Sequence, residues 1–446
     1  MYRLVTIGAV MLFSVAAAGA ETLKLSLKDA MNMALENNSQ IKAARFNSQA
    51  AALGVQSAAS RYLPTVSLEE TLVASNSPTS TFMMKLDQGR FTAGDFAISS
   101  LNNPSAAHDF KTALSIQQPL FVPSLAPLKQ LAVKDAQKSQ LELEAARQGI
   151  AFQTFFTYLE VQKAIAQCLS TDKAVADARE NMRLAIVRTA AGVGLKSDEL
   201  RARTHLSQVE QQHISAANTQ TLATMKLAIL IGAPEDSVLE ISGFQGGVSV
   251  HAMSDQALSD ALLNRIEMKQ SHTALEKSDV SLTLARSEYL PTVGAFASYQ
   301  LNAKDAPFMA DNDAWTAGVS LKWNLFDGFS RGSERKRALS GQSAAREMLA
   351  STTKDIKYQL RESYIRRDEA GARLDVTRHA LQDAEETVRL LTKRYENSLA
   401  TMAELLDAQT ALNQIRANLV ETAADYDLAG GRVYYMAGTF VKEMLK

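Results

Sequence analysis

The sequence predicts a mostly α-helical protein that carries a small membrane β part and is internally duplicated. Three observations predict this fold class. The block Tyr-Leu-Pro-Thr-Val occurs twice, 227 residues apart, as Tyr62–Val66 and Tyr289–Val293. Two long stretches contain no proline, and four short segments alternate between apolar and polar residues. Together these features describe one helix-then-strand unit that is present twice.

The duplication extends beyond the five-residue block. Residues 34–66 align with residues 261–293 without a gap and are identical at 11 of 33 positions. Each copy follows a helical pattern and opens an alternating one. Because proline stops a helix and fixes the turn, we expect Pro64 and Pro291 to mark two helix–strand junctions.

The first 20 residues predict an export signal that is separate from the fold. Arg3 gives a positive start, residues 4–15 an apolar core, and residues 18–20 a small-residue cleavage site. We expect the mature chain to begin near Glu21, outside the inner membrane of a bacterial host. The alternative is an N-terminal anchor that stays in place.

Composition excludes some classes of partner. Lysine and arginine total 47 and aspartate and glutamate 48, a balance that argues against a nucleic-acid partner. The single cysteine, Cys168, has no partner for an internal disulfide and predicts a buried, inert thiol, with a reactive thiol as the alternative.

The proline-free stretches predict very long helices. Proline costs about 3 kcal/mol inside a helix, and residues 128–233 and 308–446 contain none. Both stretches are rich in helix-forming residues. We expect helices at residues 27–61, 124–189, 197–231, 254–288, 330–394 and 401–437.

The last two predicted helices carry a seven-residue apolar repeat, which keeps one seam of a helix facing a partner. The short connection at residues 396–400 predicts an antiparallel hairpin, and the alternative is an ordinary amphipathic face on a globular core. The two series are Leu374, Leu381, Val388 and Tyr395, and Leu405, Leu412, Leu419, Tyr426 and Val433.

Four segments alternate with a period of two, at residues 65–73, 110–117, 292–301 and 314–325. Alternation over about ten residues is typical of a transmembrane barrel strand, and the alternative is a half-buried strand in a soluble sandwich. Four strands cannot close a barrel, and open edges in lipid are costly. We therefore expect other copies of the chain to complete it.

These elements predict two repeats, each with one helix, one β-hairpin and a set of long helices. The first repeat covers residues 21–248, with its hairpin at 64–119 and its long helices at 124–231. The second covers residues 249–446, with its hairpin at 291–325 and its long helices at 330–437. We expect the links at residues 75–109 and 302–313 to be hairpin loops at the outer surface.

Several motifs in this order resemble the TolC-like outer-membrane efflux proteins. They are the duplicated junction, Trp-Asn-Leu-Phe-Asp-Gly-Phe at residues 323–329, Arg-Tyr-Glu-Asn-Ser-Leu at 394–399, and Glu-Leu-Leu-Asp-Ala-Gln at 404–409. The resemblance covers almost the whole mature chain. Residues 118–121 and 200–206 of the first half echo residues 323–326 and 406–412 of the second.

The resemblance implies a passive channel that contains no cofactor. A homotrimer would form a 12-strand barrel in outer-membrane lipid and a 12-helix tunnel that extends into the periplasm and closes at its far end. A periplasmic adaptor and an inner-membrane pump would dock there and drive export of small molecules or proteins. This implies a location in the bacterial outer membrane.

The resemblance also implies the residues of the closed entrance. Glu404 and Asp407 match acidic positions that line it, and Tyr395 matches a tyrosine that restrains neighbouring helices. A spacing of three puts the two acids on one helical face, and rings of acids favour cations. The alternative is an acidic helix start that the helix dipole stabilises.

The chain departs from the family pattern at one turn. Asn397 and Ser398 stand where a glycine is usual, and Ala400 stands where a basic residue can help to lock the entrance. The other turn keeps its glycines, Gly192 and Gly194. We expect Gly192, Gly194, Lys196, Asn397 and Ser398 to contact the adaptor.

The sequence contains no catalytic or metal-binding signature. The six histidines form no cluster with ligand spacing, although His205 and His213 could share one helical face. We therefore expect a protein that is not an enzyme. The remaining alternatives are a structural coiled-coil rod, which has no need of Trp315 and Trp323 as aromatic girdles, and a porin, which needs more strands.

Overall fold

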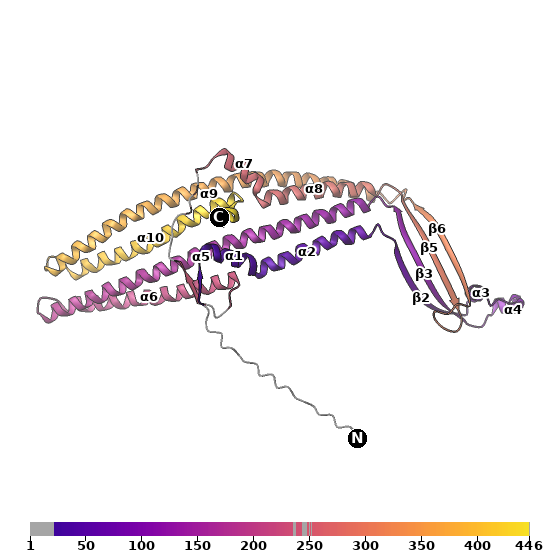
Figure 1. Ribbon diagram of the computed structural model, residues 1–446, viewed down its shortest axis with the longest axis horizontal. Coiled ribbons are helices and arrows are strands. Elements are labelled where there is room, and N and C mark those ends of the chain that lie inside the picture. Colours follow the sequence, from indigo (N-terminus) through magenta and orange to yellow (C-terminus); the bar gives the residue numbers. More distant parts are fainter. Residues whose placement is uncertain (1–21, 235–237, 243–247, 249, 251, 446) are drawn as a thin grey trace, which may run out of the picture. The chain divides into compact units, whose positions relative to one another are not determined.

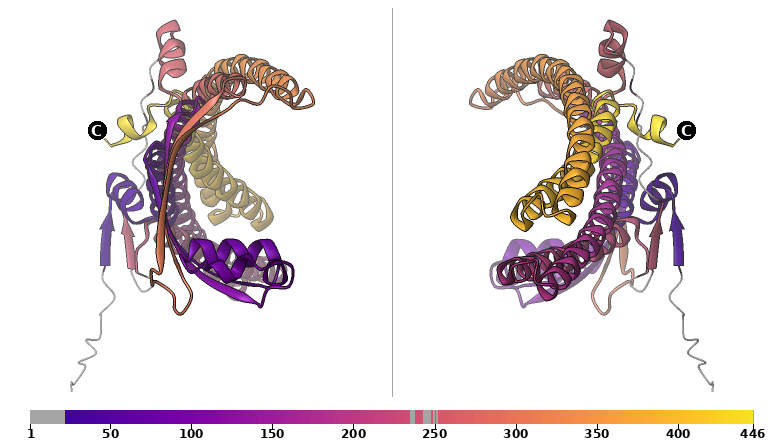
Figure 2. Two further views of the ribbon diagram at one scale, coloured as in Figure 1. Left: turned by 90° about the vertical axis from the view of Figure 1, so that its right-hand side faces the viewer. Right: turned by 90° about the vertical axis from the view of Figure 1, so that its left-hand side faces the viewer.

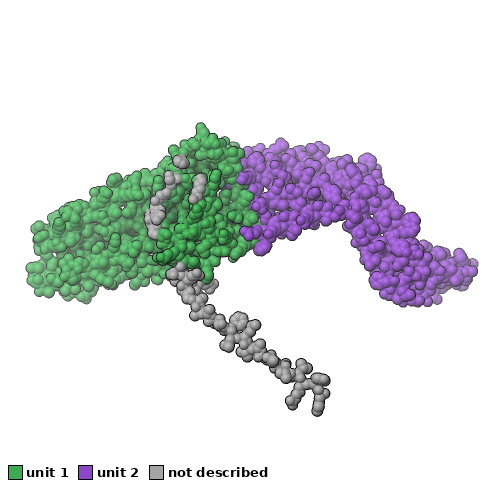
Figure 3. All heavy atoms as spheres, in the orientation of Figure 1, with its two compact units in different colours: residues 1–44, 143–266, 353–446 green, residues 45–142, 267–352 purple. Residues whose placement is uncertain are grey.

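The computed structural model describes residues 22–234, 238–242, 248, 250 and 252–445. The predicted export signal at residues 1–20 lies outside this range. The chain divides into two compact units (Figure 3). Unit 1 contains residues 1–44, 143–266 and 353–446, and unit 2 contains residues 45–142 and 267–352.

Two helical hairpins dominate unit 1. One consists of the C-terminal part of α5 (Leu125–Ala190) and α6 (Lys196–Ile231), and the other of the C-terminal part of α9 (Ser330–Glu396) and α10 (Met402–Met436). The hairpins lie side by side with their turns at the same end (Figures 1 and 2). These four helices confirm the prediction, and all nine positions of the two heptad series are buried or half-buried.

The predicted helices at 27–61 and 254–288 are each wrong as single helices. Both are broken, at Asn38 and Arg265, where ψ is 128° and 133°. The resulting helices are α1 (Leu27–Asn37), α2 (Ser39–Ser60), α7 (Asp255–Asn264) and α8 (Ile266–Ser287). The breaks lie 227 residues apart, the offset of the sequence repeat.

Tertiary hydrogen bonds hold both breaks, and these could not be seen in the sequence. The buried side-chain amide of Asn38 donates to the carbonyl oxygen of Leu230 at 3.0 Å. The guanidinium of Arg265, also buried, donates to Oε1 of Gln359 at 2.8 Å. At each break the residue leaves the helical backbone conformation, and its side chain forms a hydrogen bond to a neighbouring helix.

A small parallel sheet and an apolar core lie beside the hairpins in unit 1. Strands β1 (Thr22–Leu25) and β4 (Val238–Ile241) pair in parallel, and the sequence did not predict them because each has only four residues. The core includes Met31, Phe155 and Leu227, with Phe440 from α11 (Phe440–Met444). Among the described residues, no helix contains an apolar run long enough to cross a membrane.

Unit 2 contains the four predicted strands, which are confirmed as one antiparallel sheet in the order β2-β3-β5-β6 (Figure 1). They are β2 (Thr65–Ser75), β3 (Ala107–Phe121), β5 (Thr292–Ala303) and β6 (Asn312–Lys322). The register aligns the apolar residues of all four strands on one face. One row across it is Leu68, Leu114, Tyr299 and Trp315, each exposed by 42% or more.

The connection between β2 and β3 is folded, which corrects the predicted simple loop. It contains α3 (Pro78–Asp87), a 3-10 turn η1 (Ala93–Phe96) and α4 (Ile98–Asn102). Its rings of Phe82, Phe91 and Phe96 pack edge to face. The buried side chain of Gln88 donates to Oδ1 of Asp109 at 2.8 Å, which ties the connection to the end of the sheet.

Each of the two predicted junctions is closed by a hydrogen bond of the same kind, from a side-chain nitrogen to the carbonyl oxygen of the junction tyrosine. Two residues before Pro64, the carbonyl oxygen of Tyr62 accepts from Nε2 of Gln118 at 2.9 Å. At the second junction, the carbonyl oxygen of Tyr289 accepts from Nε1 of Trp323 at 3.2 Å. Pro64 and Pro291 each stand directly before a strand, so the same closure recurs with a different donor.

Candidate functional site at the two helical turns

The two hairpin turns have matched backbone geometry. Gly192 adopts φ +73° in the α5–α6 turn, and Ser398 adopts φ +61° in the α9–α10 turn. The two positions lie 206 residues apart in the sequence. Glycine tolerates this left-handed region, whereas serine pays a strain of about 1 kcal/mol or more. The second turn therefore keeps the backbone conformation of the first, although serine in place of glycine adds strain to it.

Gly194 is needed for a different reason, since its backbone passes very close to the end of α5. A Cβ at this position would lie 2.9 Å from the backbone nitrogen of Thr189 and 3.0 Å from the backbone of Arg188. Its own N–H donates to the carbonyl oxygen of Arg188 at 3.0 Å, as does that of Val193. These two hydrogen bonds from the turn therefore fix the backbone of Arg188.

Arg188 reaches across to the other hairpin and caps the end of α9. One guanidinium nitrogen donates to the carbonyl oxygens of Tyr395 and Glu396, each at 3.0 Å, and the other donates to Oγ of Ser398 at 2.7 Å. The last carbonyls of a helix lack intrahelical partners and carry partial negative charge. A cation from the neighbouring hairpin satisfies them here, so the two turns are joined.

Tyr395 lies beneath this clamp with 4% of its surface exposed. The guanidinium carbon of Arg188 lies 4.9 Å from its ring centroid, within cation–π range. Burial raises the pKa of the Tyr395 hydroxyl, and the charge of Arg188 opposes the rise. Both hairpins contribute to the apolar cluster around this ring, the tip cluster, which consists of Ala185, Ala202, Tyr395, Met402, Leu405 and Leu406.

The predicted acidic pair lies at the exposed start of α10. Glu404 closes a capping box, since its Oε2 accepts from the N–H of Thr401 at 2.7 Å and from its hydroxyl at 3.0 Å. These bonds lower the pKa of the Glu404 carboxyl. Asp407 is exposed one turn further on. Glu404 thus has the structural role of a helix start and is also exposed.

Lys196 is engaged within its own hairpin. Its ammonium donates to Oε2 of Glu199 at 2.6 Å, while Arg203 donates to Oε1 at 3.0 Å. The Lys196 hydrogen bond lowers the pKa of the Glu199 carboxyl. Asn397 likewise donates its side-chain amide to the carbonyl oxygen of Lys393 at 2.8 Å. The structure therefore brings Tyr395, Ser398 and Arg188 together, while Lys196 and Asn397 serve their own hairpins.

Further contacts between the hairpins follow the tip cluster along the helices. The buried side chains of Asn181 on α5 and Gln409 on α10 hydrogen-bond to each other. Beyond them, Arg416 of α10 lies 3.7 Å from Asp177 of α5 and 3.5 Å from Glu385 of α9. Burial raises the pKa of the Asp177 carboxyl, and Arg416 opposes the rise.

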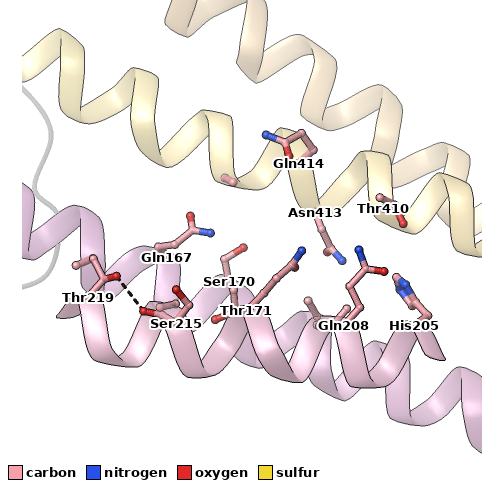
Figure 4. A pocket seen from close by; sticks show the side chains of 16 residues that line it. Gln167, Ser170, Thr171, His205, Gln208, Ser215, Thr219, Thr410, Asn413 and Gln414 are labelled. Atoms are coloured by element: carbon pink, nitrogen blue, oxygen red, sulfur yellow. Dashed lines mark hydrogen bonds between the residues drawn. The ribbon is translucent and has the colours of Figure 1, made fainter. Parts of the chain in front are cut away.

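A polar groove of ≈ 390 Å³ lies between the hairpins alongside these contacts (Figure 4). Side chains of α5, α6 and α10 line it with amides and hydroxyls, among them Gln167, Gln208 and Asn413. Burial lowers the pKa of His205, which favours its neutral form. The hairpins are thus tied closely at their turns and enclose a neutral, polar space further along.

Arg188 is a site residue that the sequence did not predict. Ala400 stands where the family can carry a basic residue, and in the structure Arg188, near the end of α5, donates to the α9–α10 turn instead. The offset of 206 residues pairs Arg188 with Arg394, which donates to the carbonyl oxygen of Leu399 in its own turn at 3.3 Å. This internal pairing could have identified Arg188 as a second arginine at a turn.

Comparisons with known proteins identify the family to which the chain belongs. The family model described as "Outer membrane efflux protein" matches residues 30–233 and 257–439. The alkaline protease secretion protein AprF of Pseudomonas aeruginosa is 22% identical over 335 residues, which are 74% of this chain and 69% of AprF.

Solved structures share the fold at low sequence identity. The CmeC outer membrane channel of Campylobacter jejuni has a TM-score of 0.75 and 17% identity, with 94% of this chain and 89% of that chain covered. The outer membrane protein VceC of Vibrio cholerae has a TM-score of 0.75 and 19% identity, with 92% and 96% covered. The chain therefore belongs to the outer membrane efflux protein family, and the protein is an efflux channel of the outer membrane that extends into the periplasm.

Proposed function

We propose that the protein works as a homotrimer in which three four-stranded sheets close one twelve-stranded barrel. The sheet ends in two unpaired edges, β2 and β6. Unpaired backbone groups in lipid cost several kcal/mol each, so neighbouring copies must cover these edges. The exposed apolar row from Leu68 to Trp315 supports a face that contacts outer-membrane lipid.

The two helical turns are the periplasmic entrance of the proposed trimer, and the clamp of Arg188 on Tyr395 and Ser398 keeps them closed. This clamp is the observation that carries the proposal, because it joins two hairpins whose separation would widen the entrance. Threefold symmetry turns Glu404 and Asp407 into rings of carboxylates, which favour cations.

A periplasmic adaptor contacts the turns through Gly192, Gly194, Lys196, Asn397 and Ser398, and an inner-membrane pump supplies the energy. The exported cargo is a small molecule or a protein. The similarity to AprF, named as a secretion protein for alkaline protease, supports protein export as one use of this fold. We also propose that residues 21–248 and 249–446 are two copies of one unit, a division supported by the matching breaks at Asn38 and Arg265.

Planar-bilayer recordings on the detergent-extracted protein test this function. We expect a trimer with small, cation-selective conductance, and we expect Glu404→Gln with Asp407→Asn to lower the cation selectivity and raise the conductance. Glu386→Gln is the matched control, because Glu386 pairs with Arg389 on the exposed side of α9. A monomeric protein without conductance would refute the proposal.

A further inference from the structure

Three side chains with metal-ligating atoms meet between α5 and α6. Cys168 and Asp172 come from α5, and His213 comes from α6. One ligand atom of each lies within 4.8 Å of the other two. The sequence predicts an inert Cys168 and no histidine cluster, because His213 reaches this position only when the hairpin folds back.

The helical spacing explains why these three groups converge. Cys168 and Asp172 are four residues apart and therefore share one face of α5. Facing helices of a bundle commonly supply metal ligands in this way. Zinc bonds of roughly 2.0–2.3 Å place tetrahedral ligand atoms about 3.5 Å apart, so small side-chain rotations bring the observed group to a bound geometry.

Neighbouring contacts orient the histidine. Nδ1 of His213 lies 3.3 Å from Oδ1 of Asp172 and 3.3 Å from Oγ1 of Thr171. The hydroxyl of Thr171 donates to the carbonyl oxygen of Cys168 at 2.9 Å, which leaves its oxygen free to accept. These two contacts hold the imidazole ring of His213 facing Asp172 and Thr171.

The cluster is open to solvent on one side. The Asp172 side chain is 57% exposed and that of His213 is 33% exposed, while Cys168 is half-buried in the seam. A cation can therefore enter from solvent and reach the thiol. A thiolate and a carboxylate together supply two negative charges, which match a divalent ion.

We propose that Cys168, Asp172 and His213 bind one divalent cation of borderline softness, such as Zn²⁺, and so tie α5 to α6. Thiolate, imidazole and carboxylate are the donor types that zinc accepts, and three protein ligands leave one position for water or an external ligand. The proposal concerns one hairpin of one chain and does not depend on the trimer or on the entrance clamp.

Calorimetric titration of zinc into the full-length, detergent-extracted protein under a phosphine reductant tests the site. We expect one zinc per chain in the wild type. Cys168→Ser and His213→Ala should each weaken binding by about 100-fold or more, since even partners outside the ligand set cost about 10–100-fold. His205→Ala is the matched control, because His205 lies on the same helix eight residues away, and it should bind as the wild type does.

Cobalt provides a readout that does not need a variant to fold. Co²⁺ bound by the wild type should show the near-ultraviolet charge-transfer band of a cobalt–thiolate bond, and zinc should displace it. Absence of zinc binding, a cobalt spectrum without the thiolate band, or equal zinc affinity in the wild type and in correctly folded His213→Ala would each overturn the site. In those cases Asp172 and His213 form only a hydrogen-bonded pair.

Discussion

Arg188 and Tyr395 come from different hairpins and meet where the two turns lie together. The guanidinium donates to the carbonyl oxygen of Tyr395 at 3.0 Å and stacks 4.9 Å from the centroid of its ring. One side chain therefore satisfies the end of α9 and covers the buried ring that anchors the tip cluster. This arrangement couples the integrity of the turn to the contact between the hairpins.

Ser398 combines a strained backbone with a useful hydroxyl, and two substitutions separate the two effects. Ser398→Ala removes the hydrogen bond from Arg188 and keeps φ near +61°. Ser398→Gly removes the same bond but relieves about 1 kcal/mol of strain. We expect the glycine variant to melt at a higher temperature than the alanine variant. Equal melting temperatures would contradict the strained geometry of this turn.

The two glycines of the other turn should respond differently to alanine. Gly192→Ala meets no atom within 4 Å and costs only the backbone strain of φ +73°. Gly194→Ala drives a Cβ into the backbone of Thr189 and Arg188 and must displace the arginine. We expect Gly194→Ala to raise channel conductance in bilayers and Gly192→Ala to leave it near the wild-type value. The reverse order would show that Gly194 does not position Arg188.

The folded connection between β2 and β3 should loosen in acid. The ammonium of Lys85, together with the N–H and hydroxyl of Thr92, lowers the pKa of Asp95 from 3.8 to about 2. A lowered folded-state pKa stabilises the fold above the unfolded pKa, and this contribution is lost as the pH falls from about 4 to about 2. We expect pepsin cleavage within residues 76–106 to increase across that window.

The Lys85→Met variant is the control for this acid effect. It removes the main cause of the lowered pKa, since Nζ of Lys85 lies 2.6 Å from Oδ1 of Asp95. Its pepsin sensitivity should already be high at pH 4 and change less below it. A wild-type profile that is flat between pH 4 and pH 2 would contradict the role of Asp95.

The sheet contains one glycine that no other residue can replace without movement. A Cβ on Gly318 would lie 2.8 Å from the ring of Phe296, its partner across β5 and β6, whereas a Cβ on Gly294 would find no atom closer than 3.7 Å. We expect Gly318→Val to lower the melting temperature of the protein by several degrees and Gly294→Val to leave it within about two degrees, as surface strand sites tolerate valine. Equal effects would refute the packing of Phe296 on Gly318.

Local patterns were sufficient to predict the strands and the long helices. Period-two alternation identified all four strands of the sheet, because one of its faces is mostly apolar, with Glu70 of β2 as an exception. Heptad spacing identified the seam that includes Leu374 and Leu405, both now buried. These are features that neighbouring residues in the sequence determine.

Features that depend on contacts between distant segments could not be predicted. The breaks at Asn38 and Arg265 rely on bonds to Leu230 and Gln359, which lie far away in the sequence. The clamp arises because Arg188 of another hairpin lies within reach of the carbonyl oxygens of Tyr395 and Glu396 at the end of α9. Motif matching pointed to Tyr395 and Ser398, but only the structure supplied the residue that joins them.

Bilayer conductance of Arg188→Ala tests the central claim most directly. Removing the guanidinium frees the end of α9 and uncovers Tyr395, so we expect the variant to conduct several-fold more current than the wild type. The matched control is Arg179→Ala, because Arg179 pairs with Glu210 inside the α5–α6 hairpin and should keep wild-type conductance. If the trimeric Arg188→Ala variant conducts no more than the wild type, the two turns are not held closed by Arg188.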